Sequence, residues 1–210
     1  MKLADRVSIV TGGGSGLGRS MCIQLAKEGA KVVVADLNME GAEETVQMIT
    51  ADGGQATSVE VDVANAEKID AMIETVLSKF GSIDIVCNNA GIGGSGEETV
   101  NVPDESWDKV LAVDLKSVFL VSKKVIPHML KQGKGVIINT ASASGIIASK
   151  AGVEYTAAKH GVVGITKQLA FEYGQKGVRV VAVAPGVIET PLTLEAGMTA
   201  PGGPFHDLTM

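Results

Sequence analysis

The sequence predicts an α/β fold in which a doubly wound parallel sheet lies between two layers of helices. Short runs rich in β-branched residues alternate with longer helical patterns along most of the chain, and this alternation is typical of βαβ units. The strand-like runs are nearly continuous apolar stretches, as expected for strands covered by helices on both faces. No linker, low-complexity tract or internal repeat interrupts the pattern. Right-handed crossovers would then make the sheet doubly wound.

Strands and helices are predicted in strict alternation. The predicted strands are RVSIVTG (6–12), KVVVAD (31–36), ATSVEVDV (56–63), IDIVCNNAG (83–91), GVIINTAS (135–142) and VRVVAVAPG (178–186). The predicted helical regions are 17–28, 40–51, 66–79, 105–132 and 153–173. We expect the fourth helical region to be broken near Asp114. Residues 190–210 are rich in proline, glycine and threonine, which favours a loop with one short helix.

The composition is that of one globular domain. The 210 residues are 45% hydrophobic and 20% charged, which allows a substantial core and argues against disorder. Only 3% are aromatic, so the core must consist mainly of Val, Ile, Leu, Ala and Met. Such residues suit helices that pack closely on a buried parallel sheet.

Charge, hydropathy and cysteine content argue against several classes of protein. The net charge of −6 and the lack of a basic block argue against nucleic acid as a main partner. The N-terminus lacks the pattern of a signal peptide, and no apolar run approaches the ~18 residues of a membrane span. Cys22, Cys87 and the histidines at 128, 160 and 206 show no metal-ligand spacing, so we expect reduced core thiols and no metal. A soluble, cytoplasmic protein is the simplest account.

A glycine-rich loop, TGGGSGLG, joins the first predicted strand to the first helix. Gly12, Gly16 and Gly18 allow a sharp turn and let a diphosphate approach the helix N-terminus, where N–H groups are free. The spacing excludes G-x-G-x-x-G, which would need glycine at Arg19, and no G-K-[ST] of a P-loop follows. The pattern T-G-x-x-x-G-x-G resembles that of the short-chain dehydrogenase/reductase family. This resemblance implies a Rossmann-like fold that binds a nicotinamide dinucleotide.

Asp36 ends the second predicted strand, 18 residues after Gly18. A carboxylate at this point can accept hydrogen bonds from the adenosine ribose and repels a 2′-phosphate. No arginine lies in the glycine loop or just after Asp36, and Arg19 is one step inside the helix. We therefore predict NAD as the cofactor in preference to NADP.

Tyr155 and Lys159 are four residues apart in a predicted helix, so the phenol and the ammonium can face one cleft. A tyrosine in water titrates near pH ~10, and a nearby cation favours the phenolate form. Tyr155 is therefore a candidate general base for an alcohol proton, or general acid in the reverse direction. Ser142, 13 residues earlier, could hold the substrate oxygen. The spacing of these three residues resembles the catalytic signature of the family.

The resemblance implies the remaining contacts. It assigns Asp62 and Val63 to the adenine, NNAG (88–91) to the wall of the cofactor cleft and Lys159 also to the nicotinamide ribose. The cofactor-binding residues are then Gly12, Ser15, Gly16, Leu17, Gly18, Asp36, Leu37, Asp62, Val63, Asn89, Ala90, Gly91, Tyr155, Lys159, Pro185, Gly186, Ile188 and Thr190. The expected substrate contacts are Ser142, Ser144 and Tyr155, with Ile146, Glu154 and the loop after Pro191 as further pocket walls.

The implied activity is hydride transfer between NAD(H) and a secondary alcohol or ketone. Two alternatives stay open: a 3-oxoacyl-thioester (acyl carrier protein) reductase that uses NADPH, and a non-catalytic dinucleotide-sensing protein. Asp36, and Ser15 where NADPH users tend to carry a basic residue, argue against the first. The presence of both Tyr155 and Lys159 argues against the second. The resemblance also implies a homodimer or homotetramer that assembles through helices 105–132 and 153–173, with a small alcohol or carbonyl compound as substrate.

The sequence departs from the family pattern at two places. Asp114 lies where the family usually has Asn, in a distorted helix turn that holds a water leading to the lysine. Ionised Asp only accepts hydrogen bonds, whereas Asn also donates, so we count Asp114 with the catalytic residues and expect it to offset part of the Lys159 charge. The family also continues with another helix and a seventh strand, and nothing after Thr190 resembles a strand. We therefore expect a single domain (1–210) whose 191–210 segment is a substrate loop and whose C-terminal end is incomplete.

Overall fold

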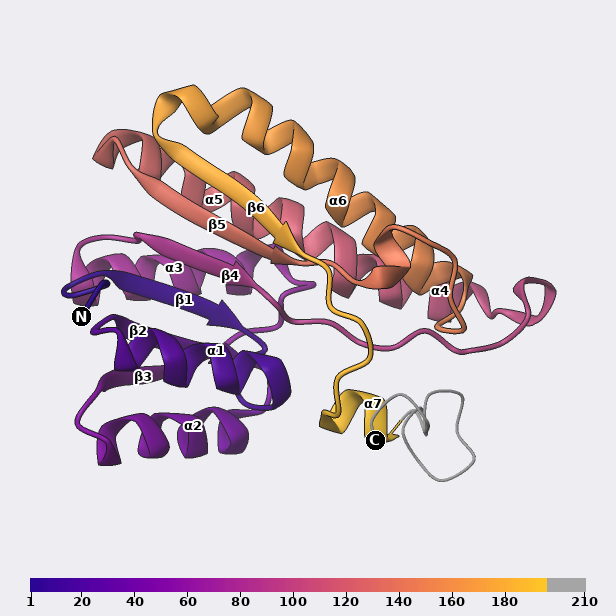
Figure 1. Cartoon of the computed structure of the whole chain (residues 1–210), viewed down its shortest axis with the longest axis horizontal. Helices are drawn as coiled ribbons and strands as arrows, with labels where there is room; N and C mark the ends of the chain where they lie inside the picture. Colours follow the sequence, from indigo (N-terminus) through magenta and orange to yellow (C-terminus); the bar gives the residue numbers. More distant parts are fainter. Residues whose placement is uncertain (196–210) are drawn as a thin grey trace.

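A parallel sheet of six strands forms the centre of the fold (Figure 1); the computed structural model describes residues 1–195. The strands are β1 (Val7–Thr11), β2 (Lys31–Asp36), β3 (Gln55–Glu60), β4 (Ile85–Asn88), β5 (Gly135–Thr140) and β6 (Val178–Val183). Their order is β3-β2-β1-β4-β5-β6, and every neighbouring pair is parallel. The chain thus passes first to one side of β1 and then to the other, which confirms the predicted doubly wound sheet.

Helices cover both faces of this sheet. They are α1 (Gly16–Lys27), α2 (Met39–Ala51), α3 (Ala66–Phe80), α4 (Asp104–Leu111), α5 (Ser117–Gln132), α6 (Val153–Tyr173) and α7 (Pro191–Glu195), with 3-10 turns at Thr99–Asn101, Ala143–Gly145 and Gly174–Lys176. Val32 and Val34 point into one core with residues of α1 and α2, whereas Val33 points into the other with residues of α3 and α5. This alternation produces the predicted three-layer α/β/α arrangement.

The predicted break near Asp114 is a π-helical turn. Residues Ala112–Lys116 join α4 to α5 through this wider turn, and Asp114 within it is fully buried. The turn directs Asp114 toward the loop that follows β4, where its Oδ1 accepts the N–H of Ile92 at 2.9 Å. Such π-turns are frequent at functional sites.

Several predicted strands extend past the observed ones. Residues 61–63, 89–91, 141–142 and 184–186 have left the regular sheet. Val61 and Val63 remain buried in the loop, so the apolar pattern continues where the hydrogen-bonded ladder has ended. Of the predicted loop at 190–210, residues 191–195 form the short helix α7, and residues 196–210 lie outside the described part of the chain. Within residues 1–195, no helix is long and apolar enough to cross a membrane.

Asp84 ties together the amino-terminal ends of β1 and β4. Its Oδ2 accepts the N–H of Val7 at 3.1 Å and the hydroxyl of Ser82 at 3.2 Å, and its Oδ1 pairs with Arg6 at 2.9 Å. Burial opposes ionisation of this carboxyl, but the three hydrogen bonds and the Arg6 charge outweigh burial and lower the pKa of Asp84. The ionised form therefore stabilises the amino-terminal ends of these two central strands.

Replacing Asp84 with Asn should lower the free energy of unfolding at neutral pH by about 1–3 kcal/mol, because charge-assisted hydrogen bonds of a buried group are lost. The folded pKa is depressed, so this contribution is complete above the unfolded value of about 3.9 and disappears as the pH falls through the folded value. In urea unfolding, the difference in the free energy of unfolding between wild type and variant should become smaller below pH ~4. The exposed Asp52→Asn variant is the control and should show no gap. A gap for Asp84→Asn that stays constant down to pH ~3 would contradict this account.

Candidate active site

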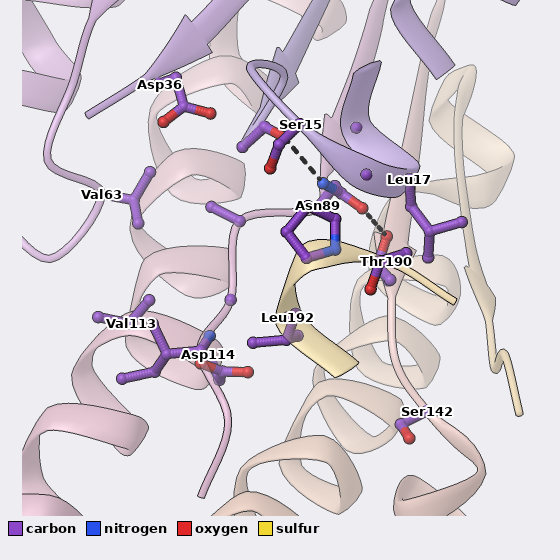
Figure 2. Close-up of a pocket in the computed structure, with 18 of the residues that line it drawn as sticks. Ser15, Leu17, Asp36, Val63, Asn89, Val113, Asp114, Ser142, Thr190 and Leu192 are labelled. Carbon is purple, nitrogen blue, oxygen red and sulfur yellow. Dashed lines mark hydrogen bonds between the residues drawn. The ribbon is translucent and has the colours of Figure 1, made fainter. Parts of the chain in front are cut away.

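The carboxyl ends of the strands border a cavity of about 640 Å³. Its walls come from the loops after β1, β2, β3, β4, β5 and β6, the N-terminus of α1, the π-turn, the start of α6, and α7. Figure 2 shows Asp36 and Ser142 at opposite ends of this cavity, with Thr190 and Leu192 of the α7 region between them. Open α/β sheets bind ligands at this edge, where the strand order reverses on either side of the first strand.

The predicted cofactor and catalytic residues all line this one cavity. They are Gly12, Ser15, Gly16, Leu17, Gly18, Asp36, Leu37, Asp62, Val63, Asn89, Ala90, Gly91, Asp114, Ser142, Tyr155, Lys159, Pro185, Gly186, Ile188 and Thr190. These residues come from segments up to 178 positions apart in the chain, between Gly12 and Thr190. The fold brings them together because parallel strands end at a common edge.

Three residues predicted as substrate contacts or pocket walls do not line this cavity. Ser144 is buried, with its hydroxyl oxygen 2.6 Å from that of Ser149, and it does not line the cavity. Ile146 is 65% exposed, and Glu154 is 0% exposed beneath another loop. For Glu154 the reason is that adjacent residues of a helix point about 100° apart, so it does not share a face with Tyr155. Ser144 and Ile146 lie in and just after the 3-10 turn Ala143–Gly145, which turns them away from the cavity.

Sequence reasoning missed several residues of the cavity wall, among them Ile92, Val113 and Thr140, whereas Leu192 belongs to the predicted wall after Pro191. Thr140 could have been found, since it is the last residue of β5 and strand ends border such sites. Ile92 could have been found as the residue after NNAG. Val113 carried no signal in the sequence, because the π-turn brings it to the cavity.

The glycine loop leaves space for an anion at the start of α1. Gly12 and Gly16 have φ values of +65° and +50°, which glycine adopts readily. A Cβ atom on Gly18 would lie 1.9 Å from the carbonyl oxygen of Gly12. Ser15 is the N-cap of α1 but makes no side-chain capping bond, and the first helical bond runs from Arg19 N–H to Ser15. The N–H groups before Arg19 therefore lack helical partners and can bind a phosphate.

Asp36 is held in place by the backbone beside this loop. Its Oδ2 accepts the N–H of Gly14 at 2.8 Å, and its Oδ1 accepts the N–H of Asn38 at 2.9 Å. The guanidinium of Arg19 is directed to α2, where it pairs with Glu44 at 2.8 Å and donates to Thr45 at 3.0 Å. Asp36 thus presents negative charge to the cavity, while the nearby cation Arg19 is neutralised elsewhere.

Asn89 joins the ends of three strands. Its Nδ2 donates to the carbonyl oxygens of Thr11 at 3.1 Å and Gly12 at 3.4 Å, and its Oδ1 accepts the hydroxyl of Thr140 at 3.3 Å. The dashed lines at Asn89 in Figure 2 mark hydrogen bonds of this side chain to cavity-lining residues. Its own N–H donates to the Thr11 hydroxyl at 3.0 Å. The loops after β1, β4 and β5 are therefore fixed relative to one another, which keeps the cavity open.

Lys159 lies at the centre of the polar end of the cavity. It is 4% exposed, and its Nζ donates to the carbonyl oxygen of Thr140 at 3.2 Å. The same atom lies 3.0 Å from Asp114 Oδ2, an ion-pair contact whose angle falls outside hydrogen-bond geometry. It also lies 5.3 Å from the centroid of the Tyr155 ring. Burial raises the pKa of Asp114, and the positive charge of Lys159 is the largest opposing effect.

Ser142 and Tyr155 can present hydroxyl groups at this end of the cavity. The Oγ of Ser142 accepts the N–H of Ser144 at 3.1 Å, which leaves its own proton available for donation. Tyr155 is half-buried and lines the cavity together with Ser142. Two hydroxyl groups beside a buried cation can bind an oxygen atom and move a proton to or from it.

The cysteines take no part in this site. Cys22 and Cys87 are free and buried, and burial raises the pKa of each thiol to about 12, so both stay protonated. Within residues 1–195, no group of three or more His, Cys, Asp or Glu side chains could hold a metal ion.

Comparison with known proteins relates the whole described fold to one family. The family described as short chain dehydrogenase matches residues 6–200. A cyclohexanol dehydrogenase from Acinetobacter sp. is 42% identical over 194 residues, which span 92% of this chain and 77% of that protein. The crystal structure of a levodione reductase matches with a TM-score of 0.91 at 40% identity, over 95% of this chain and 78% of that one. A 3-ketoacyl-(acyl-carrier-protein) reductase from Brucella melitensis, solved in complex with NADH, matches with a TM-score of 0.87 at 38% identity, over 91% and 79% of the two chains.

Proposed function

This chain belongs to the short-chain dehydrogenase family, and we propose that it transfers a hydride between NAD(H) and a secondary alcohol or ketone with Tyr155 as the proton carrier. As a member of that family it is an oxidoreductase that acts on CH–OH groups with NAD(H) or NADP(H). One observation carries the proposal: the buried Lys159 ammonium lies 5.3 Å from the Tyr155 ring in the wall of the cavity.

In the proposed oxidation, the hydroxyl of Ser142 donates a hydrogen bond to the substrate oxygen. The Tyr155 phenolate, which the charge of Lys159 stabilises, takes the proton that leaves the alcohol and becomes a phenol. In the reduction, Tyr155 returns that proton to the carbonyl oxygen. Bound nicotinamide supplies the hydride acceptor or donor. The apolar walls from Ile92 and Leu192 limit the access of water to the reacting atoms.

We propose NAD as the preferred dinucleotide. The free N–H groups at the start of α1 would hold the diphosphate, and Asp36 would accept hydrogen bonds from the adenosine ribose. A 2′-phosphate would meet the Asp36 carboxylate, and Arg19 is already paired with Glu44. The Brucella melitensis reductase with a similar fold was solved with NADH, which is consistent with this choice.

We propose a small uncharged secondary alcohol, such as a cycloalkanol, as the substrate class. Ile92, Ala141 and Leu192 are apolar walls of the cavity, and a relative with 42% identity is named for cyclohexanol. A second candidate is a 3-oxoacyl-thioester of acyl carrier protein, because a structure with 38% identity is named for that activity. A screen of cycloalkanols and 3-oxoacyl thioesters with both dinucleotides separates the two, and activity on thioesters alone would exclude the first.

Replacing Tyr155 with Phe should lower kcat by about 10²–10⁴-fold, the usual contribution of a general acid or base. The Kd for NADH, measured by fluorescence titration, should stay within about twofold because the ring remains in place. The other tyrosine of the chain, Tyr173 at the end of α6, offers a matched control, and Tyr173→Phe should turn over normally. Full turnover by Tyr155→Phe with bound dinucleotide would refute the proposed mechanism.

The ratio of kcat/KM for NAD⁺ over NADP⁺ should exceed about tenfold in the wild type, since the Asp36 carboxylate repels the 2′-phosphate. In Asp36→Ala the ratio should fall by about tenfold or more, a change of about 1.4 kcal/mol. Asp62 is a second carboxylate of the cavity, at the end of β3, and Asp62→Ala should leave the ratio unchanged. An unchanged ratio in Asp36→Ala would mean that another feature selects the dinucleotide.

The rate of alcohol oxidation should rise with pH as the phenolate forms. Replacing Asp114 with Asn should move this rise to lower pH by about one unit. The reason is that the ionised carboxylate, 3.0 Å from Lys159 Nζ, offsets part of the charge that stabilises the phenolate. Removing this carboxylate lets the phenolate form at lower pH. The pH–rate profiles of wild type, Asp114→Asn and the exposed control Asp108→Asn provide the measurement. Superimposable profiles for all three proteins would overturn the prediction.

A further inference from the structure

A segment with four glycines forms part of the cavity wall at its start and runs beyond the cavity. Residues 91–96 read GIGGSG, and glycine loses more conformational freedom on ordering than any other residue. Gly91 and Ile92 line the cavity, and a Cβ atom on Gly93 would lie 4.0 Å from the side chain of Leu192, another wall residue. The segment therefore needs interactions from outside itself to keep one conformation.

Two buried carboxylates hold the backbone of this segment. Asp114 accepts the N–H of Ile92 at 2.9 Å near its start. Glu154 is 0% exposed, and its Oε1 accepts the N–H of Ser95 at 2.5 Å near its end. The hydroxyl of Ser106 on α4 lies 3.5 Å from the same oxygen and is a weaker partner.

The space around Glu154 is closely filled by backbone. A Cβ atom on Gly94 would lie 2.2 Å from the carbonyl oxygen of Ala151 and 3.1 Å from Glu154 Oε1. A Cβ atom on Gly152 would lie 2.8 Å from Glu154 Oε2. The segment after β4 and the turn before α6 thus enclose the carboxylate, at the end of the molecule where α4 and the start of α6 meet in Figure 1.

Hydrogen bonds to the glycine-rich segment favour the ionised form of this carboxyl. Burial opposes its ionisation, but the hydrogen bonds from Ser95 outweigh burial, and the pKa of Glu154 is lowered. The charged Oε1 thus forms a strong bond to the backbone of residue 95, which ties the segment to the start of α6.

We propose that Glu154 is a positioning residue: by holding Ser95 it fixes the segment 91–96, and with it the cavity wall at Gly91 and Ile92, at a set place relative to its neighbour Tyr155. The inference rests on the proposed function, because it concerns the substrate end of the same cavity. Glu154 is the second residue of α6 (Val153–Tyr173), the helix that carries Tyr155 and Lys159. One helix therefore carries both Tyr155 and Glu154, the residue that holds the segment 91–96. The position of this helix then sets the distance between Tyr155 and that segment across the cavity.

The test compares Glu154→Ala with Glu154→Gln. Alanine removes the acceptor of the Ser95 N–H, and the KM for the alcohol should rise by about tenfold or more, the effect of losing a charge-assisted hydrogen bond. The Kd for NADH should stay within about twofold, because the glycine loop and Asp36 are remote in the cavity. Gln keeps a carbonyl acceptor and should restore the KM to within about threefold of wild type. Ser106→Ala is the matched control and should resemble wild type.

Two further measurements keep the inference testable. Hydrogen exchange of the amides of residues 93–96 should be faster in Glu154→Ala and unchanged in Ser106→Ala. Gly94→Ala should raise the KM in the same way, because its Cβ cannot fit against Ala151. Unchanged exchange, an unchanged KM, or an equal loss of NADH binding in Glu154→Ala would each overturn the positioning role. A wild-type protein without dehydrogenase activity would instead refute the proposed function, whatever the exchange data show.

Discussion

The buried ammonium of Lys159 is the interaction on which the site depends. It joins the end of β5 through Thr140, the π-turn through Asp114 and the face of α6 through the Tyr155 ring. An isolated charge at 4% exposure would be costly, and it is accepted because a carbonyl dipole and a carboxylate surround it. The same surroundings determine how much of its charge acts on the phenol. The contacts that stabilise the buried Lys159 charge are therefore the same contacts that set its effect on Tyr155.

Carboxylates position backbone throughout the cavity. Asp36 holds the glycine loop through Gly14, Asp114 holds the loop after β4 through Ile92, and Glu154 holds the same loop through Ser95. In each case a carboxyl oxygen accepts an N–H that the sheet or a helix leaves without a partner, and such a bond is strong when the carboxyl is ionised. Glycine-rich loops permit close approach to ligands but have no stiffness of their own. The carboxylates supply that stiffness, and two of them also face the cavity.

The contacts of Asn89 show how the order of the strands brings the loops of the site together. Strands β1, β4 and β5 are neighbours in the sheet, so one amide at the end of β4 can reach Thr11 on one side and Thr140 on the other. The cavity stays open because these loops are tied to one another and diverge from the sheet edge. A ligand that enters here contacts residues far apart in sequence. Each short motif of this chain therefore predicts the site only weakly, whereas the motifs taken together predict it well.

The sequence by itself determined the alternating elements, the parallel sheet, the glycine loop and the Tyr155–Lys159 pair. These features depend on local periodicity and short spacing, which a chain encodes within about one or two helical turns. Only the tertiary structure decided that Ser144 and Glu154 face away from the cavity and that Val113 borders it. It also decided that Asp114 pairs with Lys159 at 3.0 Å. Those facts depend on the rotation of a helix, the insertion of one π-turn and the path of a loop, and such properties are set by long-range packing that no local pattern records.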